Sequence, residues 1–276
     1  NISGAQTGKD GGGGALFVFS SKVILDQTHI DGCSAGVRGG GGILLDGGAE
    51  ADLYEGVLSD NVARGGFGGH IRVTASRLNI FGASKELKNV PPVRPMFPND
   101  HPLSGTQGTT TMTNGTALSG GGISCSSAKF PKLGVKIEPG TAISYSSATG
   151  SRNSEGGGGL AAAFCDVRLE GASFTNNVAI HGNGGAALLG NGVEFMAIKN
   201  AVFKDNRASD SGGALACTEC ESVLLAGGTR FEGNEAHVNG GAISIVNPGS
   251  PDPTNSSGSV FRSNTAETGN GGAVYF

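Results

Sequence analysis

Residues 203–214 read Phe-Lys-Asp-Asn-Arg-Ala-Ser-Asp-Ser-Gly-Gly-Ala, and this stretch decides the fold because both of its short motifs recur. Phe-x-x-Asn followed by Gly-Gly-Ala occurs four times in the last third of the chain. The phenylalanines are 29, 28 and 30 residues apart, and the copies are Phe174 with Asn177, Phe203 with Asn206, Phe231 with Asn234, and Phe261 with Asn264. A period of this length is typical of a solenoid, in which each repeat buries its apolar face only against its neighbours.

Weaker copies extend the repeat toward the N-terminus. Glycine pairs followed by Ala, Ile, Leu or His occur at Gly13–Gly14, Gly41–Gly42, Gly68–Gly69, Gly121–Gly122 and Gly158–Gly159. The asparagine position has degenerate forms at Ser3, Cys33, Asn61 and Ser146, each followed two residues later by alanine. These replacements are small or polar, as a tight turn requires. We therefore predict one solenoid over residues 1–276.

The composition decides between helical and β repeats. The chain has 51 glycines in 276 residues, and each glycine inside a helix costs roughly 1 kcal/mol relative to alanine. Short β-branched or aromatic stretches, several of them alternating, occur at residues 15–19, 22–25, 242–246 and 273–276. Three such strands with their turns fill one period. The prediction is an all-β, single-stranded parallel β-helix of about 28 residues per coil, with coils about 4.8 Å apart.

The recurring motif has a mechanical interpretation. The four phenylalanines are expected to point inward and stack on the equivalent ring of the next coil. The four asparagines are expected at a turn, where a short amide tolerates left-handed backbone and bonds to the backbone or to the amide one coil away. The glycine pairs let the turn pass close to the next strand. We predict a structural ladder, with the alternative that the ladder also binds a ligand.

Phe-x-x-Asn together with Gly-Gly-Ala-(Ile/Leu/Val) resembles the repeats of the chlamydial polymorphic membrane proteins. The resemblance is strong over residues 156–276 and diffuse over residues 1–81. It implies a right-handed β-helix, exposed at a cell surface and involved in adhesion. Similar repeats also occur in predicted extracellular proteins of algae and other protists. The membrane barrel that ends the bacterial proteins is not found in this sequence.

Composition and charge favour an extracellular shaft. Hydrophobic residues make up 37% of the chain, as expected for a thin solenoid core, and 19 basic against 23 acidic residues give a net charge of -4. This balance predicts no nucleic-acid partner. No run of 18 apolar residues predicts a membrane span, and the first residues lack the layout of a signal peptide. The expected localisation is extracellular or at the cell surface.

Both ends of the sequence fall inside the repeat. Neither end carries a polar capping segment, so the terminal coils are expected to expose unpaired strand edges. We predict either a piece of a longer solenoid or a subunit that associates end to end in a fibre.

Proline marks two interruptions of the repeat. All ten prolines lie within residues 91–139 and 248–253, whereas a regular strand would lose a ladder hydrogen bond to proline. We predict a Pro/Gly/Thr-rich loop insertion at 82–118 and a shorter Pro/Ser-rich insertion at 247–259. Residues 85–115 are the predicted place of a recognition element, with a solvated decoration as the alternative.

Three N-x-S/T sequons are glycosylation candidates, at Asn1, Asn114 and Asn255. Two of them lie in the predicted insertions, where a glycan could project without breaking a coil.

Five cysteines suggest an oxidising compartment. Cys217 and Cys220 have a Cys-x-x-Cys spacing without a second pair, which disfavours zinc and favours a local disulfide. Cys125 and Cys165 each follow a glycine pair on consecutive coils, within disulfide reach of one another. Cys33 occupies the asparagine position and is expected to be a small buried thiol.

An enzyme is the second interpretation, because parallel β-helices also host polysaccharide lyases and glycoside hydrolases. Such chemistry needs carboxylates clustered on one exposed face. Asp166, Arg168 and Glu170 alternate along one predicted strand, and Lys199 is expected nearby on the next coil. An ordinary polar outer face explains the same alternation.

The predicted function is a non-catalytic extracellular shaft or adhesin, without a cofactor, a metal or a catalytic residue. The expected partners are copies or extensions of the same solenoid and a host or matrix surface. A carbohydrate-active enzyme is the alternative.

Overall fold

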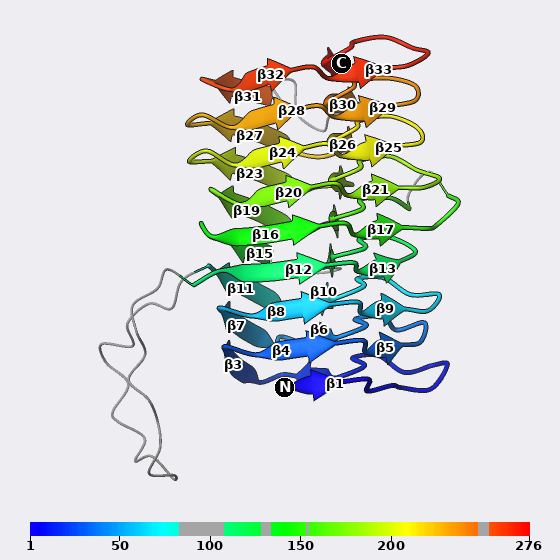
Figure 1. The fold of residues 1–276 in the computed structure, drawn as a ribbon, viewed down its shortest axis with the longest axis vertical. Helices are drawn as coiled ribbons and strands as arrows, with labels where there is room; N and C mark the ends of the chain where they lie inside the picture. Colours follow the sequence, from blue (N-terminus) through cyan, green and yellow to red (C-terminus); the bar gives the residue numbers. More distant parts are fainter. Residues whose placement is uncertain (83–107, 128–133, 153–154, 248–253) are drawn as a thin grey trace.

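The computed structural model describes residues 1–82, 108–127, 134–152, 155–247 and 254–276. These residues form a parallel β-solenoid of about eight turns with bridges about 28 residues apart and no helix, so the predicted fold class is confirmed. The chain runs along the front of the solenoid, returns behind it and climbs by one strand, which gives a right-handed coil (Figure 1).

Each coil except the first and the last contributes one strand to each of four sheets, numbered here in chain order from the front of Figure 1. Sheet 1 contains β1 (Ile2–Ser3), β4 (His29–Asp31), β8 (Val57–Ser59), β12 (Thr110–Thr113), β16 (Thr141–Ser144), β20 (Ser173–Thr175), β24 (Val202–Lys204), β28 (Arg230–Glu232) and β32 (Val260–Arg262). Sheet 2 contains β5 (Ser34–Ala35), β9 (Val62–Ala63), β13 (Thr116–Ala117), β17 (Ser147–Ala148), β21 (Val178–Ala179), β25 (Arg207–Ala208), β29 (Glu235–Ala236) and β33 (Thr265–Ala266).

Sheets 3 and 4 complete each coil. Sheet 3 contains β2 (Leu16–Phe19), β6 (Ile43–Asp46), β10 (Ile71–Thr74), β14 (Ile123–Ser126), β18 (Leu160–Ala163), β22 (Ala187–Leu189), β26 (Leu215–Thr218), β30 (Ile243–Val246) and β34 (Val274–Tyr275). Sheet 4 contains β3 (Lys22–Asp26), β7 (Glu50–Tyr54), β11 (Arg77–Phe81), β15 (Gly134–Ile137), β19 (Asp166–Glu170), β23 (Glu194–Ile198), β27 (Ser222–Ala226) and β31 (Thr254–Ser257).

The prediction of three strands per coil was wrong, because each coil between the first and the last has four. The missed strands are those of sheet 2, which are only two residues long and follow the asparagine directly, as β25 does after Asn206. Two residues are too few to show an alternating pattern, so the sequence reads there as a turn.

The core is a set of inward-facing columns, one residue per coil in each column. In sheet 3, Val73 pairs in register with Leu45 on one side and Cys125 on the other, and all three are at most 2% exposed. Side chains between them point outward, as the two-residue period of a strand requires. Each coil therefore buries its apolar face only against the coils next to it.

Three of the earlier glycine motifs begin one residue before the predicted pair, whereas the pairs at Gly13–Gly14 and Gly68–Gly69 were placed correctly. The first glycine of the motif has positive φ, as at Gly212 (69°), and the equivalent glycines are Gly40 (65°), Gly120 (63°) and Gly157 (67°). The predicted pairs at Gly41, Gly121 and Gly158 were thus out of register, because runs of three or four glycines conceal the start of the motif.

The asparagine position of the first coil was also misplaced. Ser3 pairs with Asp31 and Gln6 bridges to Ser34, so Ala5, and not Ser3, lies opposite Cys33.

The predicted insertions are only partly described. Within 82–118 the coil resumes at β12 and β13, so the stretch from Thr110 to Ala117 belongs to the solenoid and not to a loop. Residues 83–107, with most of the predicted recognition element, lie outside the described residues. Within 247–259, β31 likewise belongs to sheet 4, and residues 248–253 lie outside the described residues.

Candidate functional site

A column of buried amides follows the turn between sheets 1 and 2. The Oδ1 atom of Asn206 accepts hydrogen bonds from the backbone N and from Nδ2 of Asn177, both at 3.0 Å. The Nδ2 atom of Asn206 donates to the carbonyl of Phe174 at 3.0 Å and to Oδ1 of Asn234 at 2.9 Å. Asn234 repeats the same pattern toward Asn264. The structure thus joins the four predicted asparagines into one hydrogen-bonded ladder that leaves little amide capacity for a ligand.

The four predicted phenylalanines stack inside sheet 1. Ring centroids lie 5.5 Å apart for Phe174 and Phe203, 4.8 Å for Phe203 and Phe231, and 5.0 Å for Phe231 and Phe261. The first three rings are fully buried and Phe261 is partly buried. Their role is that of an apolar core, at separations typical of favourable aromatic pairs.

His70 fills a gap in the amide column. Gly115 stands where the next coil would supply an asparagine, and the ring of His70 occupies the space beside it. Because Oδ1 of Asn61 accepts from the backbone N of Cys33, Nδ2 of Asn61 faces the imidazole and donates to Nδ1 of His70 at 3.1 Å. Burial lowers the pKa of His70 to about 3, and the backbone of Thr113 offsets only part of this effect. The sequence signal, histidine in place of alanine after Gly68-Gly69, was present but was not used.

A second polar column, which the sequence reasoning missed, precedes the glycine pairs. The Oδ1 atom of Asn183 accepts from the backbone N of Ser211 at 3.0 Å, and Oδ1 of Asn239 accepts from the backbone N of Asn270 at 2.8 Å. Between them, the backbone N of Asn239 donates to Oγ of Ser211 at 3.3 Å. An Asn or Ser directly before or near each Gly-Gly pair was the available signal.

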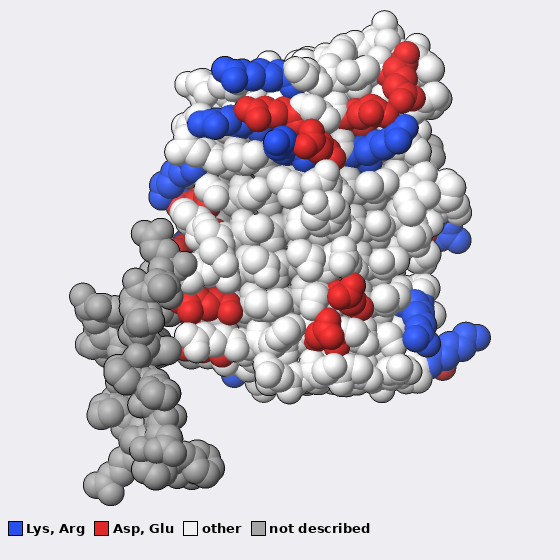
Figure 2. All heavy atoms as spheres, viewed as in Figure 1, with Lys and Arg blue, Asp and Glu red and all other residues white. Residues whose placement is uncertain are grey.

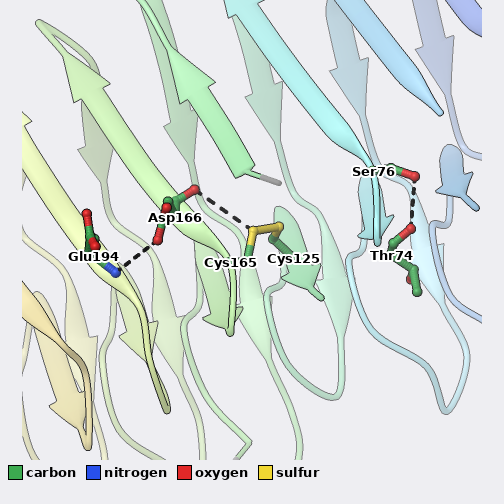
Figure 3. Close-up of a disulfide and its surroundings, with 6 residues drawn as sticks. All are labelled: Thr74, Ser76, Cys125, Cys165, Asp166 and Glu194. Atoms are coloured by element: carbon green, nitrogen blue, oxygen red, sulfur yellow. Dashed lines mark hydrogen bonds between the residues drawn. A yellow bond between two sulfur atoms is a disulfide. The ribbon is translucent and has the colours of Figure 1, made fainter. Parts of the chain in front are cut away.

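Four of the five cysteines are paired in the structure. Cys125 pairs with Cys165 across 40 residues, with Cα atoms 6.0 Å apart (Figure 3). Cys217 pairs with Cys220, with Cα atoms 5.7 Å apart. Cys33 is a free, fully buried thiol whose Sγ lies 3.3 Å from the carbonyl oxygen of Asp31. Both disulfides join the pairs proposed from the sequence and lie within the hydrophobic core cluster.

The residues predicted for an enzyme site separate into two groups on sheet 4. Glu170 accepts from Nε of Arg168 at 2.7 Å and from Nζ of Lys199 on the next coil. These two cations, Lys199 first, lower the pKa of Glu170 to about 2. A carboxylate with this pKa stays ionised near neutral pH and is a poor general acid or base.

Asp166 belongs to the second group. Its Oδ1 accepts from the backbone N of Glu194 at 3.3 Å (Figure 3). Both residues line a shallow depression of about 550 Å³ on the outer face of sheet 4, together with Arg77, Lys136 and Arg168. Two neighbouring carboxylates in a depression resemble the arrangement of a hydrolase site.

The outer face of sheet 3 forms a groove of about 710 Å³. Its floor is a column of small or apolar residues from five successive coils that are only 2–9% exposed although they point outward: Ser124, Ala161, Leu188, Ala216 and Ser244. Phe67, Phe164 and Asp210 also line the groove. The floor offers few polar groups to select a ligand.

The sequons lie in different environments. Asn1 is exposed, and Asn114 is exposed at the turn after β12 with Nδ2 donating to Oδ1 of Asp60 at 3.1 Å. Asn255 lies in β31, and its side chain is outside the description.

Among the described residues, no helix is long and apolar enough to cross a membrane. No group of three or more His, Cys, Asp or Glu side chains in the same part of the chain is placed to hold a metal ion.

Comparison with protein families supports the resemblance seen in the motifs. Residues 200–218 and 228–246 match the Chlamydia polymorphic membrane protein (Chlamydia_PMP) repeat. Each matched segment covers one Phe-x-x-Asn and one Gly-Gly-Ala motif, in β24 to β26 and β28 to β30. Neither the comparison with curated proteins nor that with solved structures gives a match. The chain is therefore a β-solenoid with two recognised repeats of this type, which indicates a membrane- or surface-associated protein.

Proposed function

We propose that this chain is a non-catalytic shaft displayed outside the cell, which presents its faces to a matrix or to another cell. The observation that carries the proposal is the amide ladder from Asn177 to Asn264, because it locks successive coils together through buried hydrogen bonds. Such a column resists bending between coils, so the solenoid holds its outer faces in fixed positions. The match to a repeat of membrane proteins supports the surface location.

Paired cysteines agree with this location. Disulfides persist in oxidising compartments and are rare in the cytosol. The structure places Cys125 with Cys165 and Cys217 with Cys220 at disulfide distance. A disulfide-bearing β-solenoid suits a protein that acts outside the cell.

Self-association is part of the proposal. Successive coils join through parallel strand pairing in all four sheets, and we propose that the coils of a second copy can be added by the same pairing. Sedimentation analysis at increasing protein concentration tests association of copies; a single species of monomer mass at every concentration would contradict it.

Surface display and adhesion require separate tests. Antibodies raised against the solenoid should label intact cells of the source organism as strongly as permeabilised cells; labelling only after permeabilisation would refute display. Beads coated with the purified protein should bind cells or extracellular matrix more than beads coated with the heat-unfolded protein. Equal binding by both kinds of bead would refute adhesion.

The alternative of a carbohydrate-active enzyme depends on the depression beside Asp166 and Glu194. We disfavour it because Glu170, the third carboxylate of the predicted cluster, is neutralised by Arg168 and Lys199. Incubation with neutral and acidic polysaccharides, followed by product analysis, tests it directly. Depolymerisation that is lost in Asp166→Asn but retained in Asp210→Asn, a change outside the depression, would establish the enzyme.

A further inference from the structure

Tyr145 is an unusual residue at its position in the repeat. It lies in the turn between β16 and β17 with a φ of 54°, a left-handed conformation that is unfavourable for a bulky side chain. Other coils place small or readily left-handed residues at this turn: Gly32, Asp60, Asn114, Asn176, Asp205 and Gly233. The tyrosine side chain is 60% exposed, so packing does not compensate for its strained backbone. Strain of this kind is a reason to look for function.

The surroundings of Tyr145 are rich in amides and hydroxyls. The register between β12, β16 and β20 places Asn114 one coil before it and Asn176 one coil after it. Hydroxyl side chains of sheets 1 and 2 lie on either side of the turn and point out of the coil. They are partly or largely buried from solvent: Thr113, Ser144, Thr175, Thr116 and Ser147. These rows repeat with the coil spacing of about 4.8 Å.

This part of the front face is uncharged. The strands β12, β13, β16, β17, β20 and β21 are described completely and contain no Lys, Arg, Asp or Glu. Figure 2 shows a white band across the middle coils, with charged side chains on the coils above and below. On the later coils the same columns carry ion pairs, such as Arg207 with Glu235 at 2.9 Å. The neutral band is therefore a local property and not a general feature of the solenoid.

We propose that this band, centred on Tyr145, binds a neutral saccharide chain, an inference that rests on the proposed non-catalytic surface function. An exposed aromatic ring offers an apolar face to the C–H groups of a pyranose ring. Amides and hydroxyls beside it donate and accept hydrogen bonds from sugar hydroxyls. A surface without charge avoids desolvating ionic groups against an uncharged ligand and gives acidic saccharides no cationic partner.

The test compares two exposed aromatic residues on the same coil, Tyr145 and Phe164. Tyr145→Asn installs the residue type of the neighbouring coils and removes the ring. Phe164→Asn is the matched control, because Phe164 lies on the same coil in the same conformation (φ 53°) and is 53% exposed, but stands at the corner between sheets 3 and 4. The probes are cellotetraose, mannotetraose and galactotetraose, with tetragalacturonate as the acidic comparator, and binding is measured by calorimetry or on immobilised sugars.

We expect at least one neutral probe to bind and the acidic probe to bind more weakly. Tyr145→Asn should weaken neutral binding about tenfold, the effect of one well-placed aromatic contact. Its melting temperature should equal or exceed that of the unaltered protein, and Phe164→Asn should leave binding unchanged. Absence of binding by every neutral probe, or equal binding by Tyr145→Asn, overturns the proposal.

Two further outcomes separate this inference from the function on which it rests. Recovery of cleaved probes by mass spectrometry would refute the non-catalytic function, whatever the effect of Tyr145→Asn on binding. Recovery of intact probes with no effect of Tyr145→Asn refutes the saccharide site alone. Cell adhesion that depends on Tyr145 but survives enzymatic removal of cell-surface glycans would assign the band to a protein partner and overturn the saccharide proposal.

Discussion

Gly213 has no side chain because the next coil occupies the space that a side chain would need. A Cβ atom at this position would overlap the carbonyl oxygen of Gly241, and equivalent overlaps occur at Gly185 and Gly241. The second glycine of the first three Gly-Gly-Ala motifs is therefore required by the close approach of two coils and not by its own φ angle, whereas a Cβ on Gly272 in the fourth motif would only make an ordinary contact. The first glycine is required by its positive φ, as at Gly212.

This difference predicts the effect of adding one methyl group. Gly213→Ala should destabilise the solenoid by about 2–3 kcal/mol, the usual effect of overpacking against backbone. Gly8→Ala is the control, because a Cβ there has no neighbour within 4 Å and the backbone has no positive φ. Urea unfolding followed by circular dichroism measures both; equal stability of the two variants would show that the coils separate to admit the methyl group.

His70 gives the solenoid a defined acid sensitivity. Its folded pKa of about 3 lies below the ordinary value of 6.5 because the charged imidazolium is buried. Between these values the unfolded chain binds more protons than the folded chain, so stability is complete above pH 6.5 and falls as the pH drops toward 3. At pH 5 the loss amounts to about 2 kcal/mol.

The measurement is the pH dependence of the free energy of unfolding between pH 7 and 4. His70→Ala should show a shallower decline than the unaltered protein, although it starts from a lower stability at pH 7 because Asn61 loses an acceptor. His29→Ala is the control, because it removes a histidine at an exposed position. Parallel slopes for His70→Ala and the unaltered protein would contradict the burial of a neutral imidazole.

At the scale of the element, the amide ladder behaves as one cooperative unit. Asn206 connects its own coil to the coils on both sides through four hydrogen bonds, and its side chain is fully buried. Without this amide, the backbone N and Nδ2 of Asn177 and the carbonyl oxygen of Phe174 lose a hydrogen-bond partner. Each buried unsatisfied group costs about 1–3 kcal/mol.

Asn206→Ala should therefore destabilise the protein by about 3 kcal/mol or more. Asn79→Ala serves as the comparison, because Asn79 lies on the outer face of sheet 4 and its amide donates a single hydrogen bond within the described part of the chain, to Oδ1 of Asp52 at 2.7 Å. Hydrogen exchange should in addition show faster exchange at the backbone amide of Asn177 in Asn206→Ala. Protection unchanged at Asn177 would mean that the ladder bonds are not formed in solution.

The repeat period and the ladder residues could be predicted because identical neighbours are stacked. A motif that must pack against its own copy repeats in sequence, so Phe203 and Asn206 reveal Phe231 and Asn234. Residues that depart from the repeat could not be predicted in the same way, because their roles depend on which different residue the neighbouring coil places beside them. The buried position of His70, for example, is explained only by the structure. Gly115 lacks the amide side chain of the column, and the imidazole takes its place.

The candidate sites were predicted less well than the fold. Alternation along one strand correctly placed Asp166, Arg168 and Glu170 on one face, but it could not show that Glu170 is held by Lys199 whereas Asp166 lies against Glu194. Tyr145 could not be distinguished from the other two tyrosines by sequence, because its significance is conformational: the sequence gives no φ angle, and the turn position is identifiable only from the register of β16 with its neighbours.

At the scale of the whole molecule, the solenoid is close to one-dimensional, because each of the described strands pairs only with its described counterparts one coil before and one coil after. Stability is then a sum of coil terms and interface terms, and one complete coil can be removed without changing the interfaces that remain. Residues 203–230 form such a unit, since Phe203 pairs with Phe231 and Val202 with Arg230. The unit also contains both members of the disulfide between Cys217 and Cys220, so its removal leaves neither cysteine unpaired.

Deletion of residues 203–230 should therefore give a folded solenoid that is shorter by one coil. Phe231 would then stack on Phe174 and Asn234 would bond to Asn177, in the places that Phe203 and Asn206 now occupy. Small-angle scattering should show the maximum dimension reduced by about 5 Å, with the β-sheet circular dichroism per residue unchanged. Deletion of residues 203–216, half of a coil, removes a similar composition but puts every later column out of register, and it should abolish cooperative unfolding. If both deletions unfold the chain to the same degree, stability depends on contacts beyond the neighbouring coils, and the additive description of the solenoid is wrong.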